Sequence, residues 1–420
     1  MFCGSCLRDN ALAAELLARG HDVLLLPVYT PTLTDEANVS DGRVFYGGIS
    51  VYLEQHVPVF RKTPAFLDRL WDAAPVLRAA TGRGVSVDPH DLGALTVSTL
   101  RGEDGNQAKE LRKLLGFLES LPAFDLVVMP NSLLLGLAPV LKRELGCPVA
   151  CTLQGEDLFL EGLREPHRTE AKALIRAHAS AVDGFVATSA YYAGFMAGYL
   201  GLDRARVHTV PLGIRLDGHG PVEAARSGPF VLGYLARVAP EKGLHLLAEA
   251  YRILRRERGL GEARLAAAGY VAPEHRGYLA EVAARFREWG LEGEFRYHGV
   301  LDRAQKIAFL QGLDALSEPS PYAEPKGLYL LEALANGVPC VQPRHGAFPE
   351  VLACTGGGLL FEPNDAASLA DQLLVLARDR EKARALGRKG AEAVRQHYSV
   401  SRMADRALHV YAGILKGVRS

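Results

Sequence analysis

Two glutamates eight residues apart, Glu324 and Glu332, flank a glycine at position 327. Pro325 and Gly327 interrupt regular structure and an apolar run follows, so the sequence predicts a loop that becomes a helix near Gly327. A helix start attracts anions such as phosphate through its unpaired N–H groups and its dipole. The two carboxylates would lie roughly 10 to 15 Å apart, about the reach of a nucleoside diphosphate sugar. One would hold sugar hydroxyls and the other ribose hydroxyls. The alternative is an amphipathic helix with two solvated glutamates.

Two cations earlier in the chain, Arg237 and Lys242, match this anion site. Residues 233–243 read as a strand, a turn with a proline and the start of a helix. Strand ends in α/β proteins point toward the ligand site, so both side chains are expected there. A diphosphate next to Glu324 and Glu332 needs cations, and arginine supplies a bidentate fork while lysine supplies a point charge. Both would stabilise the charge that develops on a leaving diphosphate. The alternative is two surface cations on a loop.

From residue 125 onward, short β-rich apolar runs alternate with segments of helical pattern. This alternation is typical of parallel βαβ units with helices on both faces. The predicted strands are 126–129, 148–153, 185–187, 207–212, 230–236, 263–268, 294–298, 315–318 and 338–342. The predicted helices are 132–145, 165–182, 190–200, 243–256, 274–289, 302–311, a helix from 327, 366–378, 381–397 and 402–415. We therefore expect an α/β protein with two doubly wound halves facing a cleft, where ligands bind by default.

The second half resembles the nucleotide-sugar domain of glycosyltransferase family 4, a retaining group with the GT-B fold of two Rossmann-like domains. The resemblance rests on residues 233–243 and 324–339, and it extends through 346–350 and 357–363. It covers essentially all of residues 230–400. The combination of these motifs is specific.

The resemblance implies a role for each charged residue of these motifs. Arg237 and Lys242 correspond to the family's two diphosphate-binding cations. Glu324 and Glu332 correspond to its E-x7-E pair, the first near the donor sugar and the second on the ribose. Catalysis is therefore expected to depend on Glu324, Arg237 and Lys242.

The resemblance also implies donor contacts that do not involve charge. The backbone amides of Gly327 and Leu328 would meet the diphosphate. Residues 297–301, with Val300 among them, would line the nucleotide base.

The first half resembles the family more loosely, with two departures. The family often carries a histidine near the donor sugar where this chain has Gln154. An amide can hydrogen-bond a hydroxyl but cannot titrate, and Asp157 is a nearby substitute for an acid or base. The glycine-rich loop before the first helix is reduced to Gly4 and Ser5. Gly4, Ser5, Gln154 and Asp157 are thus the candidate contacts for the acceptor or the sugar.

The start of the chain leaves little room for a first strand. A helix over 7–19 and a strand over 22–28 are predicted. A doubly wound domain places a strand before its first helix, so residues 2–6 are expected to be the loop after a missing strand. The predicted domains are an N-terminal acceptor-side domain over 1–215, a linker over 216–229, a nucleotide-sugar-binding domain over 230–399 and a C-terminal helix over 400–420 that crosses back to the first domain.

Composition excludes several classes of protein. The 420 residues carry 48 basic and 48 acidic side chains, and this balance offers no positive footprint for nucleic acid. No apolar run reaches the ~18 residues of a membrane helix. Residues 64–79 place apolar side chains at helical spacing. This segment is expected to pack on its own core, with peripheral contact to a membrane as the alternative.

The six cysteines do not form a disulfide scaffold, and no signal peptide precedes them, so a reducing cytoplasm is expected. A zinc site from Cys3, Cys6, Cys147 and Cys151 is an alternative, but buried free cysteine is the commoner fate. We expect neither a metal nor a cofactor.

Residues and resemblance together imply a hexosyltransferase. It would move a hexosyl unit from a nucleotide diphosphate sugar to a hydroxyl of a carbohydrate, lipid-linked or small-molecule acceptor, with retention of configuration. Two alternatives stay open: a non-catalytic sugar-nucleotide-binding protein, and a nucleotide-sugar hydrolase or epimerase. A NAD-dependent dehydrogenase is disfavoured because no G-x-G-x-x-G follows a predicted strand.

Overall fold

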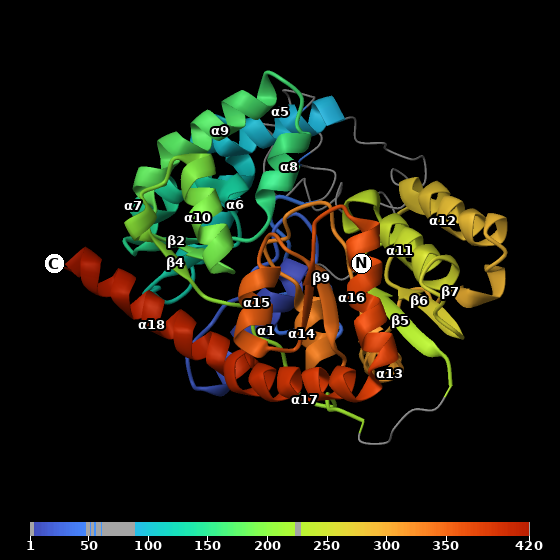
Figure 1. Cartoon of the computed structure of the whole chain (residues 1–420). Helices are drawn as coiled ribbons and strands as arrows, with labels where there is room; N and C mark the ends of the chain where they lie inside the picture. Colours follow the sequence, from blue (N-terminus) through green and yellow to red (C-terminus); the bar gives the residue numbers. More distant parts are fainter. Residues whose placement is uncertain are drawn as a thin grey trace. The chain divides into compact units, whose positions relative to one another are not determined.

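The computed structural model describes residues 4–47, 51, 54–55, 60, 89–222 and 228–419. They form two compact units, which we treat separately. The N-terminal unit comprises residues 5–211 and 404–420, and the C-terminal unit comprises Gly4 and residues 212–403. Each unit contains its own parallel sheet (Figure 1). The α/β class predicted from the alternation of strands and helices is therefore confirmed.

The sheet of the N-terminal unit has four parallel strands in the order β1-β2-β3-β4. Its strands are β1 (Val127–Met129), β2 (Val149–Leu153), β3 (Gly184–Ala187) and β4 (Val207–Thr209). Its helices include α1 (Gly4–Ala18), α5 (Pro89–Leu100), α6 (Ala108–Glu119), α7 (Ala138–Leu145), α8 (Glu156–Gly162), α9 (His167–His178) and α10 (Ala190–Leu200). Every residue of β2 and β3 is buried, as expected for strands covered on both faces.

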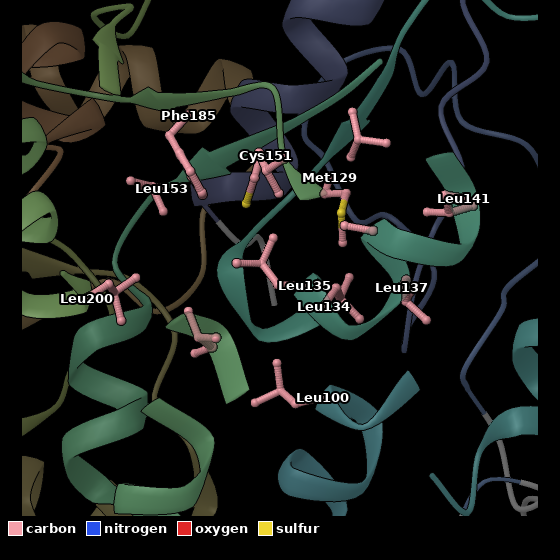
Figure 2. Close-up of a cluster of buried hydrophobic side chains, with 14 of the residues drawn as sticks. Leu100, Met129, Leu134, Leu135, Leu137, Leu141, Cys151, Leu153, Phe185 and Leu200 are labelled. Atoms are coloured by element: carbon pink, nitrogen blue, oxygen red, sulfur yellow. The ribbon is translucent and has the colours of Figure 1, made fainter. Parts of the chain in front are cut away.

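One hydrophobic cluster forms the core of this unit, and Figure 2 shows part of it. Cys151 and Leu153 of β2 and Phe185 of β3 contribute from the sheet. Leu134 and Leu135 come from the 3-10 helix η4 (Ser132–Leu137), which continues directly into α7. Strand β2, which precedes the candidate residues Gln154 and Asp157, is thus anchored in the hydrophobic core.

The prediction of a strand over residues 22–28 is wrong. This segment forms no strand. Its β-pairing among the described residues is one isolated parallel bridge, between Val28 and Phe45. The Phe45 amide donates to the carbonyl of Pro27 at 3.2 Å, whereas Pro27 itself has no N–H to offer. An apolar run becomes a strand only with a continuous ladder partner, and the segment has none among the described residues. The segment predicted over 64–79 lies outside the described residues.

The sheet of the C-terminal unit has six parallel strands in the order β10-β9-β8-β5-β6-β7. Its strands are β5 (Phe230–Leu235), β6 (Ala263–Ala268), β7 (Phe295–Tyr297), β8 (Ala315–Leu316), β9 (Cys340–Pro343) and β10 (Gly358–Phe361). Its helices include α11 (Leu244–Arg256), α12 (Arg276–Glu288), α13 (Arg303–Gln311), α14 (Leu328–Ala335), α15 (Phe348–Thr355), α16 (Ala366–Arg378) and α17 (Arg380–His397). The strand order reverses between β5 and β8, which is the point where open α/β sheets bind ligands.

Both faces of this sheet are covered. Leu232 and Tyr234 of β5 belong to one buried cluster, and Leu235 belongs to a second, with Val231 packed against it. This alternation is the period-2 pattern of a strand with two buried faces. Tight packing on both sides leaves the strand ends as the place for a ligand.

The last helix, α18 (Val400–Arg419), is shared between the units. Its residues from Ala404 belong to the N-terminal unit, where Arg19 Nη1 lies 2.7 Å from Asp405 Oδ1. Figure 1 shows α17 and α18 as consecutive red helices. Among the helices that the structure describes, none combines the length and the apolar character needed to cross a bilayer.

Candidate functional site

The candidate site of the C-terminal unit begins at the carboxyl end of β5. The chain turns through a short 3-10 helix, η7 (Pro240–Lys242), and enters α11 at Gly243. Gly243 has a φ of 73°, and a Cβ there would lie 2.0 Å from the carbonyl oxygen of Pro319. Glycine is required for this approach, which no side chain could tolerate. The approach places Lys242 next to the segment that follows β8.

Lys242 lies between two carboxylates at the point where the strand order reverses. Its Nζ donates to Glu324 Oε2 and lies 3.2 Å from Oε1 of Glu318. The side chains of Lys242, Glu324 and Glu318 are 17%, 9% and 0% exposed. Neither Glu318 oxygen accepts a well-aligned hydrogen bond from any described residue. One ammonium group therefore serves two buried carboxylates.

Burial and mutual charge shift all three groups. Burial alone would lower the pKa of Lys242, but Glu318 and Glu324 outweigh it and raise that pKa. Burial raises the pKa of Glu318 to about 8, because Lys242 offsets only part of the desolvation cost and Glu324 adds repulsion. Burial likewise opposes ionisation of Glu324, but the ammonium of Lys242 prevails and lowers its pKa. The ion pair is thus Lys242 with Glu324, and Glu318 is the carboxyl group most easily protonated.

Arg237 follows β5 by two residues and is the more accessible cation. Its side chain is 36% exposed, and its Nη2 donates to Glu241 of η7. Tyr234, fully buried in β5, donates from its hydroxyl to the Arg237 carbonyl at 3.2 Å. As predicted, Arg237 and Lys242 lie at the same strand end, and each has a carboxylate partner.

The loop after β9 fixes the backbone of Glu324. The Ala347 amide donates to the Glu324 carbonyl at 2.9 Å. A Cβ on Gly346, which has a φ of 62°, would lie 2.6 Å from that same oxygen. This close packing gives a structural reason for the motif over 346–350.

The helix predicted from Gly327 is confirmed as α14. Gly327 is its N-cap with a φ of 111°, and Leu328 is its first residue. At position 327 the left-handed conformation favours glycine, and the first N–H groups of the helix have no intrahelical partner. Glu332 lies one turn further on, where Lys306 Nζ of α13 is 2.6 Å from its Oε1. Each of the two predicted glutamates is thus paired with a lysine.

The segment predicted to line a nucleotide base follows β7 at the edge of the sheet. Val300 is 54% exposed. The preceding Gly299 accepts the Gly269 amide at 2.9 Å, and Tyr297 donates to the Gly269 carbonyl. The loop is therefore tied to the end of β6, with Val300 on its surface.

The four remaining candidates open α1 or follow β2. Gly4 is the first residue of α1 and belongs to the C-terminal unit, where a Cβ would lie 3.5 Å from Leu328 Cδ1. Ser5 is the next residue of the same helix. Gln154 and Asp157 follow β2 in the N-terminal unit, and each is 5% exposed.

A hydrogen-bond network holds Gln154 and Asp157. Gln154 Nε2 donates to the Pro130 carbonyl at 2.8 Å and lies 3.2 Å from Asp9 Oδ2. Asp157 Oδ1 accepts the Tyr192 hydroxyl at 2.7 Å. Gln154 Oε1 is buried and has no hydrogen-bond partner among the described residues. The side chain of Gln154 is thus held by its amide nitrogen, while its Oε1 accepts no hydrogen bond from a described residue.

The zinc alternative finds no support in the part of the chain that the structure describes. No group of three or more histidine, cysteine or acidic side chains is arranged there to hold a metal. Cys147 and Cys151 are buried free thiols whose pKa burial raises, and Cys3 lies outside the described residues.

Sequence reasoning missed two residues of this site. Glu318 ends an apolar run and lies at the end of the predicted strand 315–318, but β8 ends at Leu316. An acidic residue at the carboxyl end of a parallel strand was the available signal. Lys306 reads as an ordinary surface lysine of a helix, yet it is 8% exposed and pairs with Glu332. No sequence pattern indicates that pairing.

Comparisons with known proteins agree with this architecture. The model described as "Glycosyl transferase 4-like domain" matches residues 9–213, and that described as "Glycosyl transferases group 1" matches residues 220–393. Two curated relatives are N-acetyl-alpha-D-glucosaminyl L-malate synthase of Bacillus anthracis, 32% identical over 116 residues, and phosphatidyl-myo-inositol mannosyltransferase of Mycobacterium leprae, 35% identical over 131 residues. These alignments cover 28% and 31% of this chain, and 30% and 35% of the relatives' own lengths.

A solved structure shares the fold. Sucrose-phosphate synthase of Thermosynechococcus elongatus aligns with a TM-score of 0.63 and 18% identity, over 74% of this chain and 79% of that one. The family matches span nearly the whole chain, and both sheets have the expected parallel topology. The chain therefore belongs to the group 1 glycosyltransferases of family 4, with the GT-B class of fold.

Proposed function

We propose that the protein transfers a hexosyl unit from a nucleotide diphosphate sugar to a hydroxyl acceptor, with retention of configuration and without a metal ion. The C-terminal unit would bind the donor. The N-terminal unit would bind the acceptor, with Gln154 and Asp157 among its contacts. The relatives' names point to small-molecule and lipid-linked acceptors for those proteins, and both classes are candidates here.

The observation that carries this proposal is the arrangement of charge where the strand order reverses. Arg237 and Lys242 follow β5, and Glu324 precedes α14 and contacts the ammonium of Lys242. A diphosphate over the start of α14 would meet the helix N–H groups and both cations. The cations take the place that a divalent metal occupies in other phosphoryl and glycosyl sites, so the chemistry demands none.

The reaction assigns one task to each group. The bond between the sugar C1 and the β-phosphate oxygen breaks, and the acceptor oxygen bonds to C1 on the same face. The proton of the acceptor hydroxyl passes to the leaving phosphate oxygen, so no side-chain base is needed. Arg237 and Lys242 gain interaction energy as charge builds on that oxygen, which lowers the barrier more than it strengthens donor binding. Glu324 would orient Lys242 and hold hydroxyls of the donor sugar.

A thermal-shift screen tests this proposal. UDP-, GDP- and ADP-sugars are added one at a time, and stabilisation grows with the logarithm of ligand concentration over the dissociation constant. We expect one nucleotide to stand out, and release of its nucleoside diphosphate to require an acceptor. Rapid release without acceptor would favour a hydrolase, and tight binding with no turnover across an acceptor panel would favour a binding protein. Stabilisation by none of the donors would contradict the proposal.

A further inference from the structure

Glu318 is a buried carboxyl group for which the transfer reaction described above has no use. It follows β8 by two residues and is fully buried, and neither of its oxygens accepts an aligned hydrogen bond from a described residue. A buried charge without hydrogen bonds is costly, so this carboxyl group needs either its neighbouring cation or a proton. The only close cation among the described residues is Lys242, which is already paired with Glu324.

The groups that face Glu318 come from three elements and comprise two carboxylates, one ammonium group and one neutral phenol. They are Lys242 and Glu241 of η7, Glu324 of the loop before α14, and Tyr234 of β5. His345, from the loop after β9, lies with its Nε2 3.0 Å from the carbonyl oxygen of Ser320. Arg237 forms an ion pair with Glu241. With Glu318 ionised, Lys242 and its two carboxylates carry a net charge of −1.

A diphosphate would bring further negative charge to this cluster. It would compete with Glu318 and Glu324 for the ammonium of Lys242, and repulsion between anions in a dry site is strong. Protonating Glu318 removes one negative charge that competes with the diphosphate. The ammonium of Lys242 is then paired with the carboxylate of Glu324 alone. The pKa of Glu318, which burial raises to about 8, makes that proton available near neutral pH.

We propose that Glu318 is a positioning residue that couples donor binding to protonation: its carboxyl group is neutral when a diphosphate is bound, so that the Lys242 ammonium can turn from Glu318 to the diphosphate. This inference rests on the proposed function, because it requires the diphosphate to bind beside Lys242. Where Glu318 is ionised before binding, one proton leaves the solvent and joins a Glu318 oxygen as the anion binds. Nothing is oxidised or reduced, and Lys242 keeps its proton.

The coupling gives donor binding a particular dependence on pH. Below the pKa of Glu318 the site is ready for an anion, and binding changes little with pH. Above it, each bound diphosphate must first draw a proton from solvent, so affinity falls by up to about tenfold per pH unit. The second ionisation of a phosphate near pH ~6 lies below this window and does not disturb it.

Isothermal titration calorimetry tests the inference directly. UDP, GDP and ADP are titrated into the full chain between about pH 7 and about pH 9.5, in two buffers with different enthalpies of ionisation, which counts the protons taken up. For the nucleotide that binds, we expect uptake approaching one proton at the alkaline end and an affinity loss of about tenfold or more. Glu318→Gln, which keeps the shape without the charge, should abolish both and bind at alkaline pH as wild type does at neutral pH.

A matched control is Glu288→Gln, which removes the same charge from an exposed position of α12. It should leave proton uptake and pH dependence unchanged. Binding by wild type with no proton uptake would overturn the inference and leave the proposed function intact, even if Glu318→Gln fails to fold. Equal pH dependence in wild type and Glu318→Gln would overturn it as well. Failure of all three nucleotides to bind at any pH would instead contradict the proposed function, and this inference with it.

Discussion

Gly243 approaches Pro319 so closely that a Cβ on Gly243 would lie 2.0 Å from the Pro319 carbonyl oxygen. This backbone contact joins the turn after β5 to the segment after β8, and so it brings Lys242 to Glu318 and Glu324. The sheet supplies the two strand ends, but this contact sets the distance between the charged groups. The site therefore depends on one position where only glycine fits.

Gly243→Ala should be strongly destabilising and should abolish nucleotide-sugar binding. The new Cβ meets backbone atoms rather than a flexible side chain, so either η7 or the segment after β8 must move, at a cost of several kcal/mol (about 2 to 4). The measurement is the denaturant midpoint together with the thermal shift on adding donor. The matched control is Gly259→Ala. Gly259 has a similar φ of 65°, but a Cβ added there would meet no atom within 4 Å. Gly259→Ala should therefore lower the free energy of unfolding by only about 1 kcal/mol. Equal losses in the two variants would contradict the role of the close contact.

Glu332→Gln should weaken the binding of a nucleoside diphosphate but leave inorganic pyrophosphate binding unchanged. Glu332 is proposed to accept hydrogen bonds from the ribose, and hydrogen bonds to a charged group contribute about 1.5 to 3 kcal/mol, or roughly tenfold or more in affinity. Competition between the two ligands, measured by calorimetry, checks this. Loss of pyrophosphate binding in the variant would show that the charge of Glu332, 2.6 Å from Lys306, acts on the phosphates instead.

Glu318 should also make stability depend on pH. The pKa of this carboxyl group is raised in the folded state, to about 8, above its value near 4.3 in the unfolded chain. The folded state thus binds more protons between these values, and wild type loses stability as pH rises from about 4.3 to 8, by at most ~1.4 kcal/mol per pH unit. Glu318→Gln cannot ionise and lacks this loss. The melting temperature of the variant minus that of wild type should therefore increase from pH 5 to pH 8. A constant or shrinking difference would contradict the assignment.

The sequence allowed most of the fold and four of the six charged residues of the site to be predicted. Regular alternation marked the strands, and the helices over 190–200 and 366–378 match α10 and α16 at both ends. The strand over 22–28 failed because apolar pattern does not specify a ladder partner. Strand β10 was missed because Gly358 and its neighbours resemble a loop.

The charged residues of the site show the same limit. Arg237, Lys242, Glu324 and Glu332 were predicted because each lies in a recognisable local motif. Glu318 was not, because its burial beside Lys242 arises from a contact between segments about 75 residues apart in the chain. Local pattern specifies which residues lie at a strand end, but packing decides which of them share a cation.

The most direct test of the account is nucleoside diphosphate binding to Arg237→Ala, measured by calorimetry with UDP, GDP and ADP. Arg237 is partly exposed and pairs only with Glu241 among the described residues, so its removal should leave the fold intact. Arg252→Ala, which removes an arginine of α11 paired with Glu249 and Glu257, is the matched control. The account predicts that one nucleotide binds wild type and the control equally, and binds Arg237→Ala at least about tenfold more weakly. Equal affinity in all three proteins would contradict the claim that the end of β5 holds the donor diphosphate.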